Sequence, residues 1–571
     1  MYDLAVIGGG IAGMATAARI QARGLSTIVL EAHGQPGGCA GFFRRKGFAF
    51  DVGATTLVDF EPGGVGSELL ASIGMPRVEG EALPGHVAWL PNRRVTLYRD
   101  PAAWAAERLR MLGDTPAHRE FWAWMDRLAD VFWAASRAGI RLPIRGPSDL
   151  LRAMYCVGPV QLPLVRYLRW TMGDALQHCG LRGDRALVGL LSMLVEDTVH
   201  AEIDDAPLIN GALGITIRGA GLTRARGGMY GFWRRFVAHY RTIGGTLRVG
   251  CAVSRVERPG GRHGGYLVHT RRGSVAAAQV VSAVPAELTA RLAPPEVTRA
   301  LRPYLERDAA AQGSAVVVFL GVPESEVSGQ AFTHHQLLHD YDLPLGDGNN
   351  MFISVSAPDD TDSAPAGHRT VMISTHCKLE AWEGLSEGAY QIRKAQVGAR
   401  LIELARRVYP ELGRGAVVCE VATPRTYQRF TGRPRGAVGG VRQTLSNSNQ
   451  NSLPHDIGVP GFWLAGDTTW PGLGTVACIL GSRLVAELVL TCISRELHKP
   501  DALARERPSA PALARRVCVD RQFGSDDQCG LTTARRRSAV RSAVTGAAPQ
   551  TALATDLRHA LEHRHEPALR Q

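Results

Sequence analysis

The feature that most constrains this chain of 571 residues is a glycine-rich turn near its beginning. Residues 3–7 are typical of a buried parallel strand, and the Ala-rich segment ending near Arg23 is typical of a helix. Between them, Gly8, Gly10 and Gly13 follow the pattern GxGxxG. The first glycine makes a tight turn, the second lets a pyrophosphate approach the backbone, and the third allows close helix–strand packing. We therefore predict a dinucleotide-binding β-α-β unit.

An acidic residue follows the second predicted strand, residues 27–30. Glu31 comes eighteen residues after Gly13, where a carboxylate can accept hydrogen bonds from both hydroxyls of an adenosine ribose. The same carboxylate would repel the 2′-phosphate of NADP. FAD and NAD remain as candidate cofactors at this point.

The continuation "EAHGQPGGCAG" favours FAD. It places Gly37 and Gly38 just past the acidic residue, and a further strand leads to Asp51 and Gly53. Glycines there let the backbone lie against an extended dinucleotide and the flavin beyond it. The predicted cofactor is FAD.

A second glycine-rich stretch, "GFWLAGDTTWPGLG", lies more than four hundred residues downstream. A predicted strand delivers Gly466 and Asp467 to a turn, and Gly472 and Gly474 open a helix. Asp467 could bond a ribityl hydroxyl, and the helix dipole could stabilise negative charge on a reduced flavin. The alternative is that Asp467 caps a helix or a turn. We expect both glycine stretches to hold one FAD.

The predicted fold class is α/β, with a Rossmann-type FAD-binding domain interrupted by a mixed α+β substrate domain. Helical texture, with Asp100 and Pro101 as a helix start, marks the first insertion. Beyond residue 497 the composition is rich in Arg, Ala, Ser and Pro and lacks periodicity, which predicts a disordered basic tail. The predicted parts are FAD-binding segments 1–85, 226–290 and 441–497, substrate-domain segments 86–225 (helical) and 291–440, and the tail 498–571.

Composition bears on compartment and partners. The net charge is +12, and arginine greatly outnumbers lysine, so either an acidic partner such as anionic lipid or nucleic acid attracts this surface, or the charge only solvates it. We expect no nucleic-acid partner. The ten cysteines form no CxxC pair, which favours a reducing cytoplasm.

Any membrane contact is expected to be peripheral. The sequence shows no secretory signal pattern and no uninterrupted run of the roughly 18 apolar residues that span a bilayer. The segment "LPLVRYLRWTMGDAL" interleaves Leu164, Val165, Leu168 and Trp170 with Arg166 and Arg169, which suits a helix at an anionic lipid surface. The alternative is an internal helix with two exposed arginines.

Three other patterns carry weaker hypotheses. His335 and His339 would share one face if helical and could then hold a metal, although we expect no metal site. Glu196, Asp197 and His200 suggest acid–base chemistry, or only surface pairing. The aromatic stripe at 121–133 is either helix core or a ligand pocket.

The sequence resembles the FAD-dependent carotenoid desaturases and isomerases of the phytoene desaturase type. The resemblance covers residues 1–495 and is nearest to the carotenoid 3′,4′-desaturase and prolycopene isomerase branch. It rests on five blocks in order: "VIGGGIAGMATAARIQARG", "VLEAHGQPGGCAGFFRRKGFAFDVGAT", "VVSAVPAE", "TPRTYQRFTGRPRGAVGG" and "GFWLAGDTTWPGLGTVACILGSRLVAE". These motifs are highly specific for the flavin fold and less so for the substrate.

The resemblance implies roles for particular residues. It implies that Val253 lies by the adenine through its backbone and that Asp467 holds the ribityl chain. Many related amine oxidases have arginine directly after the paired glycines, where this chain has Cys39; Arg44 or Arg45 are candidates for the missing charge. The ADP half of the cofactor is implied to be held by Gly8, Gly10, Gly13 and Glu31.

The activity implied by the resemblance is desaturation of a carotenoid. A hydride would pass from an allylic carbon to flavin N5 while a proton leaves the neighbouring carbon, so positioning and exclusion of water would matter most. A quinone or oxygen would reoxidise the flavin, and no catalytic side chain is predicted. The alternatives are a carotenoid cis–trans isomerase, an amine oxidase, and a non-catalytic escort protein on the same fold.

Overall fold

A computed structural model describes residues 1–217, 220–259 and 264–497 of the chain. The chain divides into two compact units, Met1–Cys492 and Ile493–Gln571. The first unit contains all the strands and nearly all the helices of the described residues, and helix α14 (Thr475–Leu497) continues from it into the second. The predicted basic tail at 498–571 lies outside the described residues.

Three distant parts of the chain build the first sheet. Its order is β10-β2-β1-β13-β12-β11, and β19 also pairs with β13. Strands β10, β2, β1, β13 and β19 run parallel, whereas β11, β12 and β13 form an antiparallel meander. The strands are β1 (Tyr2–Ile7), β2 (Thr27–Leu30), β10 (Thr246–Arg248), β11 (Val253–Glu257), β12 (Tyr266–Thr270), β13 (Gly273–Ser282) and β19 (Phe462–Leu464).

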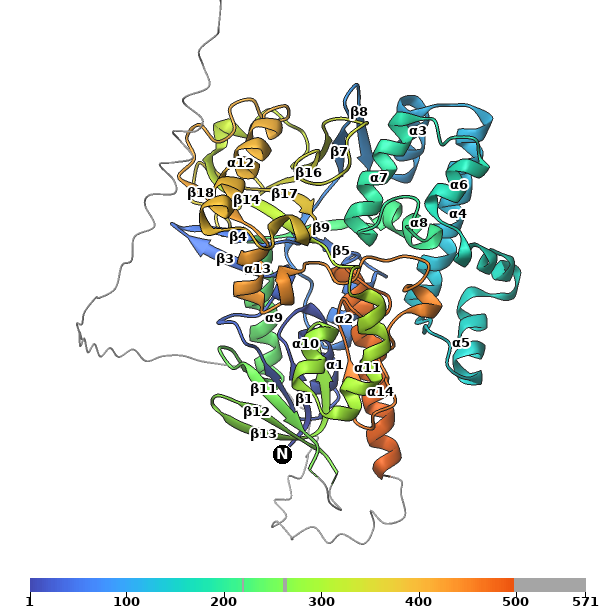
Figure 1. The fold of residues 1–571 in the computed structure, drawn as a ribbon, viewed down its shortest axis with the longest axis vertical. Helices are drawn as coiled ribbons and strands as arrows, with labels where there is room; N and C mark the ends of the chain where they lie inside the picture. Colours follow the sequence, from blue (N-terminus) through green and yellow to red (C-terminus); the bar gives the residue numbers. More distant parts are fainter. Residues whose placement is uncertain (218–219, 260–263, 498–571) are drawn as a thin grey trace, which may run out of the picture. The chain divides into compact units, whose positions relative to one another are not determined.

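Helices pack against this sheet, as a buried parallel sheet requires. Helix α1 (Ile11–Gln21) is buried along nearly its whole length because small residues, chiefly alanine, let it approach β1 and β2 closely. The others in this part of the chain are α2 (Val65–Ser72), α9 (Gly228–Thr242), α10 (Ala286–Leu292), α11 (Pro295–Asp308) and α14. The predicted Rossmann-type α/β arrangement is confirmed (Figure 1).

A second sheet has the order β18-β14-β17-β16-β15-β7-β8. All pairs in this sheet are antiparallel except β15 with β7. The hairpin of β7 and β8 precedes the helical segment, and β7 pairs with a strand that lies more than two hundred residues further along the chain. The strands are β7 (Gly85–Trp89), β8 (Arg94–Tyr98), β14 (Ser314–Pro323), β15 (His334–Leu338), β16 (Asn350–Val355), β17 (His368–Cys377) and β18 (Val418–Ala422), and helix α12 (Glu387–Ala405) packs on β14, β17 and β18.

The segment between β8 and β9 (Leu222–Ala225) is helical (Figure 1), whereas the part predicted to be helical, 86–225, also contains β7 and β8 at its start and β9 at its end. Asp100 caps its first helix by accepting a hydrogen bond from the Ala103 amide at 2.8 Å. The aromatic stripe proves to be core, with Phe121 and Met125 fully buried. The helices are α3 (Pro101–Leu112), α4 (Pro116–Ala138), α5 (Pro147–Val157), α6 (Met172–His178), α7 (Arg185–Val199) and α8 (Leu208–Ile217).

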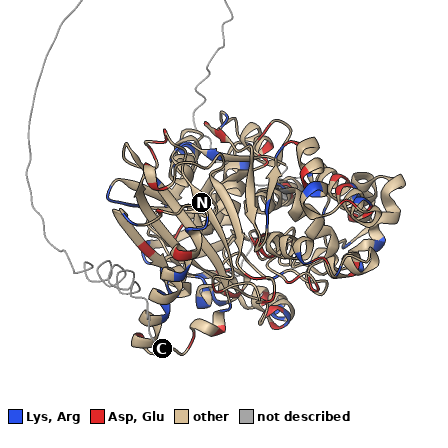
Figure 2. Cartoon of the chain, turned by 90° about the horizontal axis from the view of Figure 1, so that it is seen from above, with Lys and Arg blue, Asp and Glu red and all other residues tan. Residues whose placement is uncertain are grey.

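Smaller elements complete the described chain: β3 (Phe42–Arg45), β4 (Phe48–Asp51), β5 (Leu57–Val58), β6 (Gly80–Ala82) and α13 (Pro424–Thr431). Strands β3 and β4 form a two-stranded antiparallel sheet, and β9 lies between β5 and β6 in a three-stranded antiparallel sheet. In the cartoon of Figure 2, the Lys and Arg positions are interspersed along the described chain with the Asp and Glu positions.

Two local expectations were wrong. The segment 162–176 is not one helix, because Pro163 falls inside a 3₁₀ segment, η2 (Pro159–Arg169), and α6 starts at Met172. The hypothesis that required His335 and His339 to share a helix does not hold, because His335 lies in strand β15, where a four-residue spacing is not the repeat of a helix face.

The second correction concerns apolar length. Thr475–Ser494 in α14 is long and apolar enough to cross a membrane by length and composition, although half of it is buried inside the protein. Arg483 and Glu487 interrupt the run of apolar letters, which is why a search for an uninterrupted run misses it.

Buried neutral histidines make the stability depend on pH. Burial lowers the pKa of His335 to about 4 and that of His455 to about 4. Between pH 6.5 and 4 the unfolded chain therefore binds protons that the folded chain does not, so the free energy of unfolding falls as pH drops through this window. The measurement is the free energy of unfolding in urea at pH 7 and at pH 4.5. Between these two pH values, H335Q and H455Q should each lose less of this free energy than the wild type. H368Q, at a partly exposed site, should behave as the wild type; equal losses in all variants would contradict this account.

Candidate cofactor site

The first glycine turn joins β1 to α1, and its glycines differ in what surrounds them. A Cβ at Gly13 would lie 2.1 Å from the carbonyl oxygen of Gly8, so only glycine allows this contact between turn and helix. Gly8 has φ of +100°, a conformation that favours glycine. Beside Gly10, by contrast, there is open space out to 4 Å. The turn thus combines close packing at one glycine with an open backbone at another.

The N-terminal end of α1, which begins at this turn, has backbone amides that no capping side chain accepts from. Its N-cap, Gly10, has no side chain to cap the helix, so the first amides of α1 and the positive end of its dipole are available to an anion.

Glu31 follows β2 directly and turns back toward the glycine turn. Its carboxylate accepts hydrogen bonds from the amides of Gly9 at 2.6 Å and His33 at 2.7 Å. Burial raises the pKa of Glu31, while these backbone bonds act in the opposite direction. The Glu31 carbonyl also accepts from the amide of Cys251 at 2.8 Å, which brings the start of β11, at Val253, toward this carboxylate.

The paired glycines lie against the first turn. The Gly37 amide donates to the Gly9 carbonyl at 2.9 Å, and Gly37 has φ of +131°. A Cβ at Gly38 would have only the Gly10 Cα as a neighbour, at 3.5 Å. The backbone from 37 to 38 therefore forms a second wall beside the open space at Gly10.

The second glycine turn reaches the same place. Strand β19 pairs with β13, which pairs with β1 on its other side. Gly8 and Gly466 consequently both face the end of β13: an added Cβ would lie 3.1 Å from the Ala283 carbonyl oxygen at Gly8 and 3.8 Å from it at Gly466. Gly474 has φ of +96° and open space around it. The two glycine stretches thus converge on one edge of the sheet.

Asp467 is held by a residue that the sequence patterns did not indicate. It forms a charge-assisted hydrogen bond with the guanidinium of Arg433, and both side chains are 13% exposed. The Asp467 charge raises the pKa of Arg433 despite the opposing effect of burial. Arg433 also offsets the rise that burial causes in the pKa of the Cys39 thiol. Cys39 therefore lies within the electrostatic reach of the second turn.

Arg433, rather than Arg44 or Arg45, brings positive charge near Cys39. Arg44 stacks over the ring of Tyr230 at 4.9 Å, and Arg45 pairs with Glu420 at an exposed position. The block "TGRPRGAVGG" contained the signal, but only the folded chain shows which of its two arginines turns inward.

A polar cluster lies at the end of α7, beside the second turn. A Cβ at Gly439 would fall 2.0 Å from the His200 ring, while one at the neighbouring Gly440 would fall 2.3 Å from the Asp467 carbonyl oxygen. The His200 and His376 rings are 4.8 Å apart, centre to centre. His200 and the ribityl-binding candidate Asp467 therefore flank one glycine pair.

The surroundings shift the pKa values of the two histidines in this cluster in opposite directions. Burial lowers the pKa of His200 to about 3, and the neighbouring His376 acts in the same direction. Burial opposes the charge on His376, but the carboxylates of Glu196 and Asp197 raise its pKa to about 9. His376 Nε2 is 3.3 Å from Asp197, and Asn350 donates to Glu196. At neutral pH a protonated and a neutral imidazole lie side by side, which suits acid–base chemistry.

No metal site is found among the described residues. His335 accepts a hydrogen bond from the Trp89 indole at 3.2 Å and lies 2.9 Å from the Tyr409 hydroxyl. It is a satisfied core histidine.

Comparison with known proteins identifies the class. The family model for flavin containing amine oxidoreductases matches residues 200–490, a little over half of the chain, and the NAD(P)-binding Rossmann-like domain matches residues 6–73. This chain therefore belongs to the flavin-containing amine oxidoreductase family, and its Rossmann-type domain is an FAD-binding domain. The open backbone at both turns, the uncapped helix end and the two carboxylates fit that cofactor.

Two relatives of known name align with most of the chain. Prolycopene isomerase 1 from an Oncidium hybrid cultivar is 25% identical, covering 87% of this chain and 85% of the relative. The lycopene-forming phytoene desaturase of Paracoccus sp. is 22% identical, covering 85% and 97%.

Among solved structures, the cyclohexylamine oxidase of Brevibacterium oxydans has a TM-score of 0.54 at 17% identity, covering 87% of this chain and 99% of the oxidase. A putrescine oxidase has a TM-score of 0.55 at 14% identity, covering 86% and 99%. These similarities show a shared fold.

Replacing Gly13 tests the close contact in the first turn. Because its added Cβ would clash with the Gly8 carbonyl, G13A should destabilise the protein by about 1–3 kcal/mol and lower the FAD retained after purification, measured by thermal unfolding and flavin absorbance. G388A, in an open position of α12, is the matched control and should leave both unchanged or slightly raise stability. Wild-type melting and flavin content in G13A would contradict the predicted contact.

Proposed function

We propose that this chain is an FAD-dependent oxidoreductase that desaturates a carotenoid. The observation that carries the proposal is the convergence of Gly8 and Gly466 on Ala283, since it gives one dinucleotide two points of attachment at the edge of one sheet. Relatives named for prolycopene isomerisation and phytoene desaturation, aligned over 85–87% of the chain, support a carotenoid as substrate.

The proposed cofactor residues divide between the ends of FAD. Glu31 holds the adenosine ribose, the start of α1 holds the pyrophosphate, and Asp467 holds the ribityl chain. Arg433 orients the Asp467 carboxylate through their charge-assisted bond. The complete proposed set is Gly8, Gly10, Gly13, Glu31, Gly37, Gly38, Val253, Gly466, Asp467 and Gly474.

Bound FAD supplies the acceptor for the two electrons and the hydrogen that leave the substrate, and a quinone or oxygen removes them afterwards. The chain's own residues orient the polyene, exclude water and handle the second hydrogen, which leaves as a proton. We assign this proton handling to the cluster of Glu196, Asp197, His200 and His376. Burial lowers the pKa of His200 to about 3, so its neutral imidazole can accept a hydrogen bond but is a weak base. Burial raises the pKa of the Glu196 carboxyl, which makes Glu196 the better proton acceptor of the cluster.

Carotenoid cis–trans isomerisation is the second candidate reaction. It is favoured by the names of aligned relatives, and it would use the reduced flavin without net oxidation of the substrate. The relatives include prolycopene isomerases from several plants.

Expression in a carotenoid-producing host separates these reactions. Desaturation should lower the pigment mass by two hydrogens and shift its absorption to longer wavelength, because the conjugated system lengthens. An unchanged mass with a new isomer composition would replace the first reaction by the second. No change in pigment, with peroxide released from added amines, would contradict both. A host carrying D467A is the control that should leave the pigment unaltered.

Replacing the cluster tests its proton handling. E196Q and H376N should each lower product formation by about 10- to 1,000-fold while FAD content stays at the wild-type level, because neither residue belongs to the proposed cofactor set. The matched control is E120Q, an exposed glutamate on α4, which should retain full activity. Turnover by E196Q and H376N within twofold of the wild type would exclude the cluster from the reaction.

A further inference from the structure

Helix α5 has its larger apolar side chains on the outside. Leu150, Leu151, Met154 and Tyr155 lie on one face and are 48%, 68%, 44% and 85% exposed. The inward residues of the same helix, Ala153 and Val157, are smaller and buried. A helix at a protein–water boundary ordinarily places its large apolar residues inward. The reversed arrangement indicates that this face meets something other than water.

The exposed apolar face continues into η2. Val160 and Val165 are 78% and 38% exposed. Together with α5, residues 150–165 hold six of the twelve large apolar side chains that are exposed in the described part of the chain. Such a concentration distinguishes a functional patch from the scattered apolar residues of an ordinary surface.

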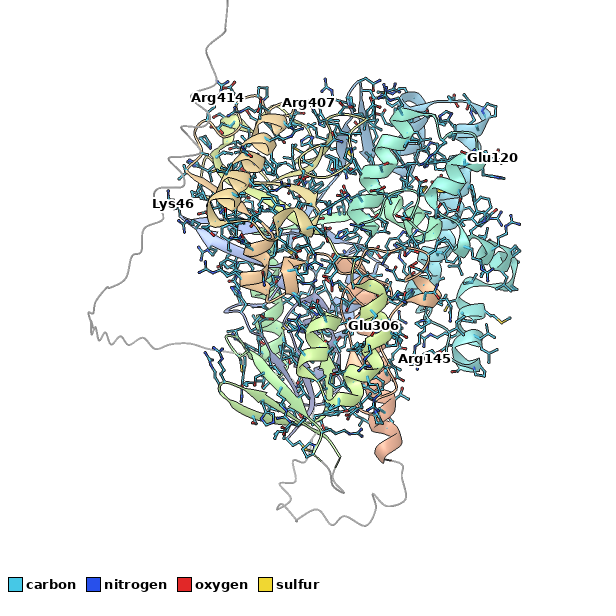
Figure 3. The ribbon with its side chains drawn as sticks, in the orientation of Figure 1. Lys46, Glu120, Arg145, Glu306, Arg407 and Arg414 are labelled. Atoms are coloured by element: carbon cyan, nitrogen blue, oxygen red, sulfur yellow. The ribbon has the colours of Figure 1, made fainter. Side chains whose placement is uncertain are left out.

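Arginines border this patch. Between residues 141 and 170 the chain has five arginines and only one acidic residue, Asp149. Arg141 and Arg152 pair with Glu487 of α14. The guanidinium groups of the exposed Arg145, Arg166 and Arg169 pair with no carboxylate among the described residues, although the Arg145 backbone amide donates to Asp149 at 3.1 Å. Figure 3 marks Arg145 close to α5. The border therefore attracts negative charge.

The patch rests on the cofactor domain rather than on a free arm. Ala153 and Val157 pack in one cluster with Trp470 and Leu484. Trp470 lies within the second glycine turn, and Leu484 lies on α14, which begins directly after that turn. A partner bound to α5 is therefore held at a fixed position relative to the second glycine turn.

We propose that α5 and η2 form a docking face for a lipid bilayer with anionic headgroups. The apolar side chains insert among the acyl chains near the headgroups, and the bordering arginines pair with phosphates. The chain's own segment 498–571 fits this face poorly because it too has an excess of basic residues. A second copy would bring the same arginines against each other. The proposal does not depend on the reaction, although a bilayer is where an apolar substrate would be found.

The test is co-sedimentation of the full-length holoenzyme with vesicles of phosphatidylcholine containing 0% or about 30% phosphatidylglycerol. The wild type should sediment with anionic vesicles and much less with neutral ones. L151S/Y155S should lower the partition coefficient at least about tenfold, because two inserted side chains are lost. R166Q/R169Q should weaken binding only to anionic vesicles. Flavin content and thermal unfolding check that each variant is folded.

A matched control substitutes an exposed apolar residue elsewhere. I392S, on α12 at a site that is 60% exposed, should sediment as the wild type does. The proposal is overturned if the wild type stays in solution, if L151S/Y155S binds as well as the wild type, or if I392S binds as weakly as the patch variant. Sedimentation velocity gives a further outcome: a dimer that L151S/Y155S abolishes would assign the face to a second copy instead. None of these readouts requires turnover, so they are independent of the proposed reaction.

Discussion

The parallel pairing of β1, β13 and β19 is the constraint on which the rest of the structure depends. Parallel strands present their carboxyl ends at one edge of a sheet, which is where nucleotide sites form. Strand β13 lies between the strands that carry the two glycine turns, so Gly8 and Gly466 must face each other across its end. The intervening chain has to leave this edge and return to it, and it uses that excursion to build the second sheet and the helices α3–α8.

Local patterns of sequence predicted the first turn well. GxGxxG and Glu31 act through contacts within about thirty residues, such as the hydrogen bond from the Gly9 amide to Glu31, and these follow from backbone geometry that glycine alone permits. The second turn was found for the same reason. The α/β class and the helical first insertion could likewise be predicted, because strand and helix periodicities were clear. The assignment of each residue to a part of FAD, and the domain boundaries, stay predictions.

Contacts between distant segments could not be predicted. The His376–Asp197 contact joins residues 179 positions apart, so the sequence alone left Asp197 indistinguishable from a surface residue. The role of Arg433 could not be predicted for the same reason, because its partner Asp467 lies 34 positions away. The sequence left open whether His335 lies in a helix or a strand, because a stretch as short as His334–Leu338 carries no clear periodicity. Near η2, the pattern of apolar and basic residues suggested a lipid-facing surface, but periodicity does not say which face of α5 points outward.

A single FAD that extends from Glu31 to Asp467 is the central claim. A crystal structure of the holoenzyme tests it most directly. We expect one FAD per chain, with its adenosine ribose hydroxyls within hydrogen-bonding distance of the Glu31 carboxylate and its ribityl chain beside Asp467. A flavin that contacts only one of these carboxylates, or a dinucleotide bound away from the Ala283 edge, would contradict the claim.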